Sequence, residues 1–120
     1  TSMFGDILSD LTGVLAGSLG MAPSINAGTG RAMAQASHGS APDIAGKGIA
    51  NPVGLILSSA MLLSWLAGER KDLVAGEAGR AIERAVAETL ALEKGPRTRD
   101  LGGTANTREF TEGILRHLVP

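Results

Sequence analysis

The sequence contains no cysteine and no tyrosine, and its aromatic residues are only Trp65, Phe4 and Phe110. Without cysteine the chain can form neither a disulfide nor a thiolate zinc site, which favours the reducing cytoplasm as its compartment. With so few aromatic residues, any core must be built from Leu, Ile, Val, Met and Ala. Since 43% of the 120 residues are hydrophobic, the chain can still bury the core of one domain.

The chain also lacks an excess of either charge. Eleven basic residues face twelve acidic ones, for a net charge of -1, so no electrostatic field gathers nucleic acid or anionic lipid. Asp6 and Asp10 stand where a secretory signal would carry basic residues. The longest apolar run, residues 53–68, contains serines and is shorter than the ~20 residues of a membrane span. We expect a cytoplasmic protein without nucleic-acid or membrane partners, in which this run forms a buried helix.

What the sequence does contain is a strong helical pattern. The spacing of apolar residues predicts helices over about residues 4–16, 52–67, 71–93 and 107–118. Residues 32–36 are the best candidate for a short strand, although alanine and methionine are weak strand formers. The sequence therefore predicts a mostly helical chain with one or two short strands.

Several residues mark where these helices begin and end. Asn51 followed by Pro52 is a typical helix start, with asparagine as the N-cap and proline at the first helical position. Asn106 and Glu109 have the spacing of a capping box for the last helix. Gly17 is expected to end the first helix, and Gly95 with Pro96 the third.

Two acidic residues on the first predicted helix have a spacing that suits a metal ion. Asp6 and Asp10 lie one helical turn apart, so their carboxylates project from the same face. Oxygen ligands favour a hard ion such as Mg²⁺ or Mn²⁺, but two carboxylates do not fill an octahedral shell. By spacing alone, two solvated acids are the simpler interpretation.

The segment from His38 to Pro52, "HGSAPDIAGKGIANP", is rich in turn-forming and small residues. Its small residues leave backbone amides that a ligand can approach closely. A carboxylate at Asp43 would accept hydrogen bonds from ribose hydroxyls and repel a phosphate. The alternative is an Asx turn, in which Asp43 bonds its own backbone. Neither Gly28-Thr29-Gly30 nor Gly46-Lys47-Gly48 completes a known phosphate-binding motif.

Four segments, taken together, resemble a known enzyme family. They are "MFGDILSD" at residues 3–10, "GSLGMAPS" at 17–24, "HGSAPDIAGKGIANP" at 38–52 and "RTRDLGG" at 97–103. In this order and spacing they resemble the C-terminal part of the isocitrate/isopropylmalate dehydrogenase family. Members of that family are metal-dependent enzymes that oxidise a 2-hydroxy acid with NAD(P) and then release carbon dioxide. The resemblance implies the C-terminal part of that family's α/β fold.

The resemblance also implies roles for individual residues. Asp6 and Asp10 would be two of the ligands of a Mg²⁺ or Mn²⁺ ion. The adenosine side of the cofactor site would be formed by the loop residues His38, Gly39, Ser40, Ala41, Pro42, Asp43, Ile44, Ile49, Ala50 and Asn51. Members that use NADP carry basic and tyrosine residues where this sequence has Asp43 and Ile44, so the expected cofactor is NAD.

The sequence departs from the family in what it leaves out. The family's catalytic tyrosine and lysine, its substrate-binding arginines and another metal-binding aspartate lie upstream of the part matched here. We therefore expect no catalytic residue in residues 1–120, a single C-terminal fragment that is inactive alone. Residues 4–16 would form the helix at the metal site and dimer interface, and residues 17–120 the cofactor loop and helical part of the large domain.

The function has more than one interpretation at this stage. The first is the NAD- and metal-binding portion of an enzyme acting on 3-isopropylmalate, with tartrate or D-malate as the alternative substrate. The second is a non-catalytic nucleotide-binding or assembly module that keeps the fold. Either interpretation predicts a homodimer or higher self-association through the apolar face of the first helix.

Overall fold

The computed structural model describes residues 2–118, which form helices, a two-stranded hairpin and short 3₁₀ turns. The helices are α1 (Ser2–Leu15), α2 (Val53–Arg70), α3 (Leu73–Ala91) and α4 (Thr107–Leu118). The strands are β1 (Pro23–Gly28) and β2 (Arg31–Ala36), and the 3₁₀ turns are η1 (Leu19–Met21), η2 (Pro42–Ile44) and η3 (Arg99–Leu101). Helical residues make up 61% of the structure, which confirms the expected mostly helical chain.

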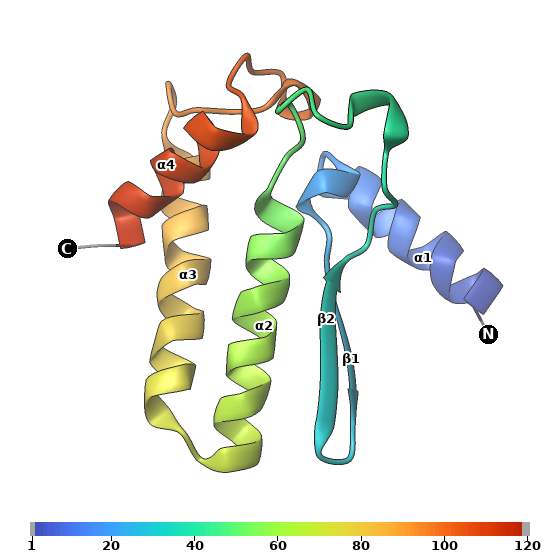
Figure 1. The fold of residues 1–120 in the computed structure, drawn as a ribbon, viewed down its shortest axis with the longest axis vertical. Helices are drawn as coiled ribbons and strands as arrows, with labels where there is room; N and C mark the ends of the chain where they lie inside the picture. The colour runs from blue at the N-terminus through green and yellow to red at the C-terminus, as the bar shows by residue number, and fades with distance from the viewer. Residues whose placement is uncertain (1, 119–120) are drawn as a thin grey trace.

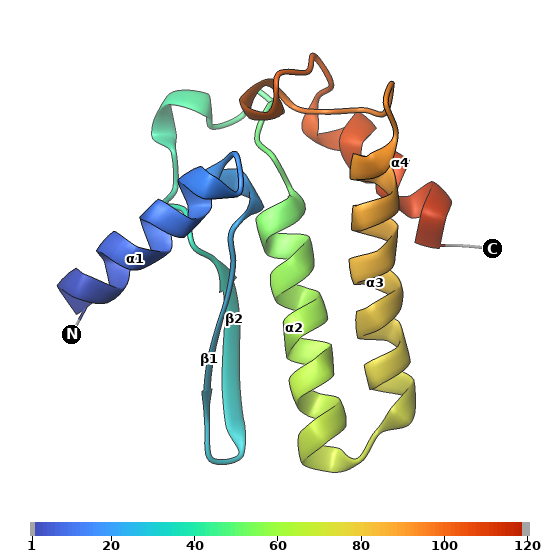
Figure 2. The ribbon, with the colours of Figure 1, turned by 180° about the vertical axis from the view of Figure 1, so that it is seen from behind.

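Helix α2 lies at the centre of the structure, between α3 and the hairpin (Figures 1 and 2). Helix α4 packs against α3, and α1 extends away from the other elements. Near the end of α1, Gly13 lies beside the side chain of Leu19. Among residues 2–118, no helix is both long enough and apolar enough to cross a membrane.

The core forms where three helices meet. Its buried side chains come from α2, α3 and α4 and are Val53, Ala85, Val86, Phe110 and Ile114. Further along the helix pair, Gly79 of α3 allows a close approach to α2, because a Cβ there would lie 3.0 Å from the carbonyl oxygen of Ala60. The absence of a side chain at Gly79 thus allows α3 to lie close to α2.

The observed helix boundaries differ from the predicted ones by a few residues. Helix α2 continues to Arg70, and Lys71, predicted to begin the next helix, instead has a left-handed backbone with φ 52°. Helix α3 begins at Leu73 because the side chain of Asp72 accepts a hydrogen bond from the amide of Ala75 at 3.1 Å. It ends at Ala91, before the predicted Glu93.

The predicted start of α4 is confirmed, whereas that of α2 is shifted by one residue. The side chain of Asn106 accepts from the amide of Glu109, and the side chain of Glu109 accepts from the amide of Asn106, both at 2.9 Å. Helix α2 begins at Val53, one residue after the predicted start, and the Val53 amide donates to Asn51 Oδ1 at 3.0 Å. The N-cap position is therefore Pro52 and not Asn51 as predicted, although the side chain of Asn51 still accepts from the first amide of the helix.

The hairpin contains one predicted strand and one that was not placed in advance. Strand β2 covers the predicted residues 32–36, and β1 pairs with it antiparallel from Pro23 opposite Ala36 to Gly28 opposite Arg31. The Gly28-Thr29-Gly30 segment makes the turn between them, with Gly30 at φ 69°. This glycine pair therefore serves a hairpin and not a phosphate.

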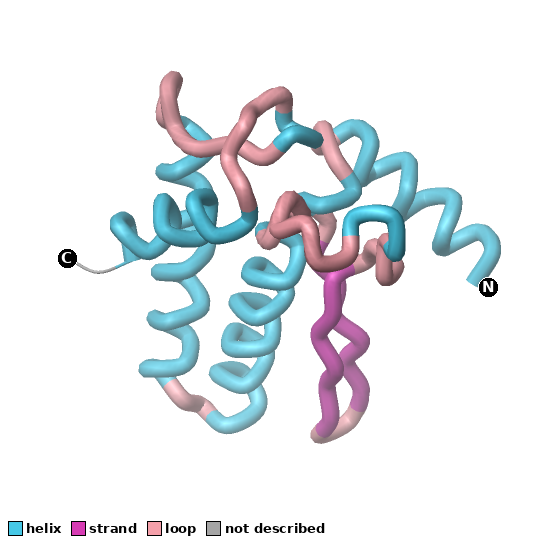
Figure 3. Tube along the Cα trace, turned by 45° about the horizontal axis from the view of Figure 1, so that its top comes forward, coloured by secondary structure: helices cyan, strands magenta, loops and turns pink. Residues whose placement is uncertain are grey.

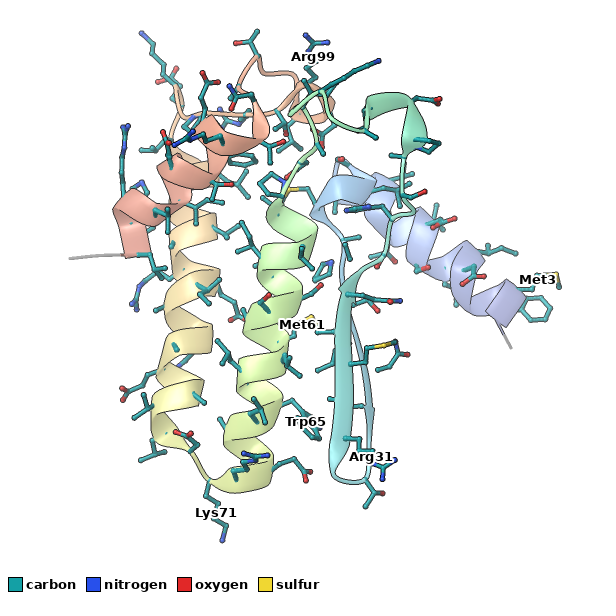
Figure 4. All side chains as sticks on the ribbon, viewed as in Figure 1. Met3, Arg31, Met61, Trp65, Lys71 and Arg99 are labelled. Atoms are coloured by element: carbon teal, nitrogen blue, oxygen red, sulfur yellow. The ribbon has the colours of Figure 1, made fainter. Side chains whose placement is uncertain are left out.

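The long loops gather at one end of the molecule. The segment between β2 and α2, the segment between α3 and α4, and the turn after α1 all lie at the N-terminal end of α2 (Figure 3). They are tied to one another there, since the amide of Thr107 donates to the carbonyl of Gly48 at 2.8 Å. Trp65 and Lys71 lie toward the opposite end of α2 (Figure 4).

Candidate functional site

A cavity of about 880 Å³ opens among these loops. It is lined by Ser18, Gly20, His38, Gly39, Ser40, Ala41, Ile44, Ala45, Gly46, Gly48, Ile49, Ala50, Asn51, Arg99, Asp100 and Thr107. Its volume is within the range of ligand-binding pockets in proteins. Most of the lining residues are small, so the wall of the cavity is largely backbone that a ligand can approach.

The predicted nucleotide-binding residues lie in this wall with two exceptions. Pro42 and Asp43 are exposed and do not line the cavity, whereas the other residues of the predicted set do. Within residues 2–118 the carboxylate of Asp43 makes no hydrogen bond or ion pair, so the structure does not contain the Asx turn considered as its alternative role. Asp43 is thus a charged side chain at the outer edge of the loop.

The backbone of this loop is held in an unusual conformation. Ala41 has φ 44° and ψ 62°, the left-handed region that a residue with a Cβ rarely occupies. Such conformations cost of order 1–3 kcal/mol and are concentrated at functional sites. Nearby, His38 Nδ1 lies 2.9 Å from the carbonyl oxygen of Gly39, so this nitrogen carries the proton. In the imidazole tautomer that makes this bond, the other ring nitrogen is an acceptor.

Three segments far apart in the sequence meet at the carboxylate of Asp100. Its Oδ2 atom accepts a hydrogen bond from Ser18 Oγ and another from Asn51 Nδ2, the latter at 2.8 Å. Ser18 Oγ also accepts from the amide of Gly20 at 3.0 Å. These bonds join the turn after α1, the start of α2 and η3 in the lining of the cavity.

Gly20 is required for this junction. A Cβ on Gly20 would lie 2.7 Å from Asn51 Cβ and 3.1 Å from Asp100 Oδ2. The first of these distances is shorter than real Cβ atoms tolerate. The absence of a side chain at Gly20 therefore lets Asn51 and Asp100 approach the turn after α1.

The same contacts shift the acidity of Asp100. Partial burial raises the pKa of Asp100. Hydrogen bonds from Ser18 and Asn51, together with the nearby Thr98 hydroxyl and the backbone, lower the pKa by more than burial raises it. The pKa of Asp100 therefore lies below its ordinary value. The Thr98 hydroxyl is fully buried and makes no hydrogen bond of good geometry with residues 2–118. Asp100 is therefore ionised throughout the neutral pH range.

This network predicts a pH-dependent stability. Because the folded pKa of Asp100 is lowered, its carboxylate stabilises the fold above the ordinary aspartate pKa of about 4, and this stabilisation is lost as the pH falls through the folded value. Between about pH 5 and about pH 3 we expect the melting temperature of the wild-type chain to fall more steeply than that of Asp100→Asn. Circular dichroism melts measure both slopes, and equal slopes would contradict this role of Asp100.

The two aspartates predicted to bind metal lie on α1, away from the lining of the cavity. Asp6 and Asp10 are exposed, and neither carboxylate takes part in an ion pair within the described residues. No group of three or more His, Cys, Asp or Glu side chains gathers in residues 2–118. The pair keeps the one-turn spacing that suits a shared hard cation, but the chain supplies only part of a coordination shell.

Sequence reasoning did not identify all the residues of the cavity. Ser18, Gly20, Arg99, Asp100 and Thr107 line it, yet none was predicted as a site residue. Arg99 is labelled at the loop end in Figure 4. The segment "RTRDLGG" contributed to the resemblance. The one local signal for a role in this site is that its arginines and aspartate stand beside a glycine turn.

The sequence and fold are similar to those of known dehydrogenases. The family model described as isocitrate/isopropylmalate dehydrogenase matches residues 1–114. The isocitrate/homoisocitrate dehydrogenase of Thermus thermophilus is 54% identical over 118 residues, which are 98% of this chain and 33% of that protein. Catalytic subunit 5 of the mitochondrial NAD isocitrate dehydrogenase of Arabidopsis thaliana is 48% identical over 118 residues, 98% of this chain and 29% of that protein.

A solved structure has the same arrangement of elements. The apo β-decarboxylating dehydrogenase of Thermococcus kodakarensis matches with a TM-score of 0.81 and 48% sequence identity, over 98% of this chain and 32% of that chain. The chain thus spans about a third of the length of the proteins that it matches. In those proteins the arrangement seen here is one part of a larger molecule.

Proposed function

Because the chain belongs to the isocitrate/isopropylmalate dehydrogenase family, we propose that it forms the adenosine side of an NAD site and part of a divalent-metal site. The intact enzyme would be a β-decarboxylating dehydrogenase that oxidises a 2-hydroxy acid. The observation that carries this proposal is that most of residues 38–51 line one cavity, together with Asp100, to which Asn51 is hydrogen-bonded. 3-Isopropylmalate is the first candidate substrate, and tartrate or D-malate is the alternative.

The chemistry of the cavity suits an adenosine group. Gly39, Ser40 and Ala41 offer closely approachable backbone, and Ile44 and Ile49 add apolar surface for a flat base. In that tautomer, the ring nitrogen of His38 that does not face Gly39 can accept a hydrogen bond from an amino group. A pocket of small and apolar residues with few polar groups is typical of a site for a small molecule or cofactor.

The position of Asp43 supports NAD over NADP. The carboxylate is exposed at the outer edge of the loop and has no partner within residues 2–118. It is therefore free to accept hydrogen bonds from both ribose hydroxyls of a bound NAD. The 2′-phosphate of NADP would bring negative charge to the same place, where like charges repel.

Asp6 and Asp10 would contribute carboxylate oxygens to a Mg²⁺ or Mn²⁺ ion. Both side chains are exposed and acidic, and hard ions prefer such oxygen ligands. An ion held by these carboxylates would supply Lewis-acid chemistry for a substrate hydroxyl and for the negative charge that decarboxylation leaves. In the described residues no third acid joins the pair, so the remaining ligands would come from substrate, water or protein outside this chain.

We propose that the chain does not complete the reaction by itself. The family's proton transfers use a tyrosine and a lysine, and the sequence contains no tyrosine. Lys47, Lys71 and Lys94 stand outside the family's catalytic motif. The role of this chain is then to bind and orient the cofactor and part of the metal ion, while the acid and base are supplied by protein that the chain does not include.

Helix α1 supports the proposal of self-association. Its large apolar side chains are all more than half exposed, from 55% for Leu11 to 80% for Leu15. They are Met3, Phe4, Ile7, Leu8, Leu11, Val14 and Leu15. An exposed apolar surface of this extent is typical of an interface. We propose that a second copy of the chain covers α1 in a homodimer.

Filling the cavity tests the proposed nucleotide site. Gly39 lines the cavity, and a Cβ built on it meets no atom within 4 Å. The variant Gly39→Leu should therefore fold as the wild type does, while its side chain occupies space needed by the ligand. We expect the affinity for NAD to fall about tenfold or more, as for a lost contact worth over one kcal/mol. Isothermal titration calorimetry with NAD measures the change.

Gly68→Leu is the matched control for this variant. Gly68 lies on α2 outside the cavity lining, and a Cβ built on it also meets no atom within 4 Å. Its affinity for NAD should equal that of the wild type. An unchanged affinity in Gly39→Leu, or an equal loss in Gly68→Leu, would remove this cavity as the nucleotide site.

A further inference from the structure

Asp100 joins three separate segments in the lining of the cavity, and no role was predicted for it from the sequence. We propose that Asp100 is a positioning residue, whose carboxylate holds the side-chain amide of Asn51 in the one orientation that serves the ligand in the cavity. The contact between the two side chains is a hydrogen bond of the structure itself and does not depend on any ligand. Only the identity of the ligand, the adenosine part of NAD, rests on the function proposed above.

The orientation of the Asn51 amide follows from its neighbours. Asn51 is only 8% exposed, so nearby protein groups decide which way its amide points. Asp100 is ionised and can only accept, so the nitrogen Nδ2 must face it. The Val53 amide can only donate, so the oxygen Oδ1 must face that side. Both neighbours select the same orientation.

This arrangement leaves part of the Asn51 amide free for a ligand. A primary amide has two N–H donors and two acceptor lone pairs. Asp100 uses one donor and Val53 uses one lone pair, so one donor and one acceptor remain. Asn51 lines the cavity, so this remaining pair can contact the polar edge of a flat base. Loss of Asp100 would leave Nδ2 without its partner and let the amide turn about its side chain.

The surroundings of Asp100 suit a fixed carboxylate. Ser18 donates to the same Oδ2 atom, and Gly20 leaves the space that this close contact needs. Among the side chains that line the cavity, the other ionisable groups are His38 and Arg99. No ion pair joins Asp100 to either of them in the described residues. The carboxylate is therefore held by hydrogen bonds from neutral groups and is not drawn away from Asn51 by a nearby cation.

Three variants test the proposal. Asp100→Ala removes both hydrogen-bond acceptors, and we expect its affinity for NAD to be at least about tenfold weaker, the usual effect of losing a hydrogen bond to a charged group. Asp100→Asn keeps one acceptor oxygen, so it should restore part of that loss. Asp72→Ala removes the aspartate that caps α3 far from the cavity. It should lower the melting temperature while leaving the affinity for NAD unchanged.

The affinities are measured by calorimetry with the full chain, and circular dichroism shows whether each variant is folded. Asp100→Asn is nearly isosteric, so it keeps the test valid if Asp100→Ala does not fold. A folded Asp100→Ala with wild-type affinity would overturn the proposal. An equal loss in Asp72→Ala would also overturn it, because Asp100 would then act only through overall stability.

A second measurement does not need a nucleotide. Exchange of the Asn51 side-chain amide protons with water, followed by NMR, should be about tenfold faster in Asp100→Ala than in the wild type, and unchanged in Asp72→Ala. If the wild type does not bind NAD, the function proposed above fails, but faster exchange in Asp100→Ala would still establish the positioning contact. Equal exchange in Asp100→Ala and the wild type would overturn it.

Discussion

Replacing Gly103 by alanine is expected to destabilise the chain by about 3 kcal/mol, the upper range for forcing an atom into a filled space. A Cβ on Gly103 would overlap the carbonyl oxygen of Arg97 and lie 2.5 Å from its carbonyl carbon. That carbonyl cannot move away easily, because it accepts a hydrogen bond from the Ala105 amide at 2.9 Å. The Gly103 amide in turn donates to the carbonyl of Thr98 at 3.0 Å. The substitution therefore strains the loop that carries Asp100.

Thermal and urea unfolding measure this effect, with Gly68→Ala as the control. A Cβ on Gly68 meets no atom within 4 Å, and alanine is the better helix former, so Gly68→Ala should be as stable as the wild type or slightly more stable. A Gly103→Ala variant as stable as the wild type would show that the loop between α3 and α4 does not have the tight conformation described here.

Replacing Asp43 by lysine is expected to reverse the preference between the two dinucleotides. In the proposed site, the substitution would remove the carboxylate that accepts from ribose hydroxyls and would place a cation near the 2′-phosphate of NADP. Like charges ~4 Å apart repel by about 4 kcal/mol at an effective dielectric constant near 20. Because Asp43 is exposed, solvent screening reduces this figure. We therefore expect the ratio of the NADP and NAD dissociation constants to fall by about tenfold or more.

The control for this variant makes the same change of charge elsewhere. Glu83 is exposed on α3 and takes no part in an ion pair within residues 2–118, so Glu83→Lys alters the net charge equally. The selectivity of Glu83→Lys between NAD and NADP should remain that of the wild type. Competition between NAD and NADP, measured by calorimetry, gives the ratio for each variant. An unchanged ratio in Asp43→Lys would remove Asp43 as the selecting residue.

The helices could be predicted because their signals are local. The capping box at Asn106 and Glu109 forms as predicted, since both partners lie within one turn of chain. The sequence pattern predicts the end of α2 a few residues too early and predicts that α3 begins at Lys71. In the structure the side chain of Asp72 caps α3, which begins at the next residue. Such boundaries depend on which of two adjacent residues turns out of the helix, and local spacing does not decide this.

Strand β1 could not be predicted from its own residues. Pro23, Ser24 and Gly28 are weak strand formers, and the strand exists because it pairs with β2 and lies against α2. The Ser24 amide donates to Ser58 Oγ at 3.1 Å, a contact across 34 positions. Tertiary packing therefore overrides local preference in this strand.

The candidate site, like the fold, could be predicted from the sequence only in part. The loop from His38 to Asn51 could be proposed from the sequence because its residues are consecutive and its motif is specific, and most of them line the cavity. Asp100 and Ser18 were missed because their contact joins positions separated by 82 residues, for which a single sequence carries no signal. Asp43 was placed in the site by resemblance, and the structure puts it at the loop's outer edge, outside the cavity wall.

The measurement that tests the account most directly is an NMR titration of the ¹⁵N-labelled wild-type chain with NAD. We predict saturable shifts in the amide signals of residues 38–51 and of η3, including the Asn51 side chain, with smaller shifts for NADP at equal concentration. Helix α3 should be unaffected at its N-terminal end, which lies far from the cavity. An absence of shifts at millimolar NAD, or shifts confined to other elements, would contradict the proposed nucleotide site.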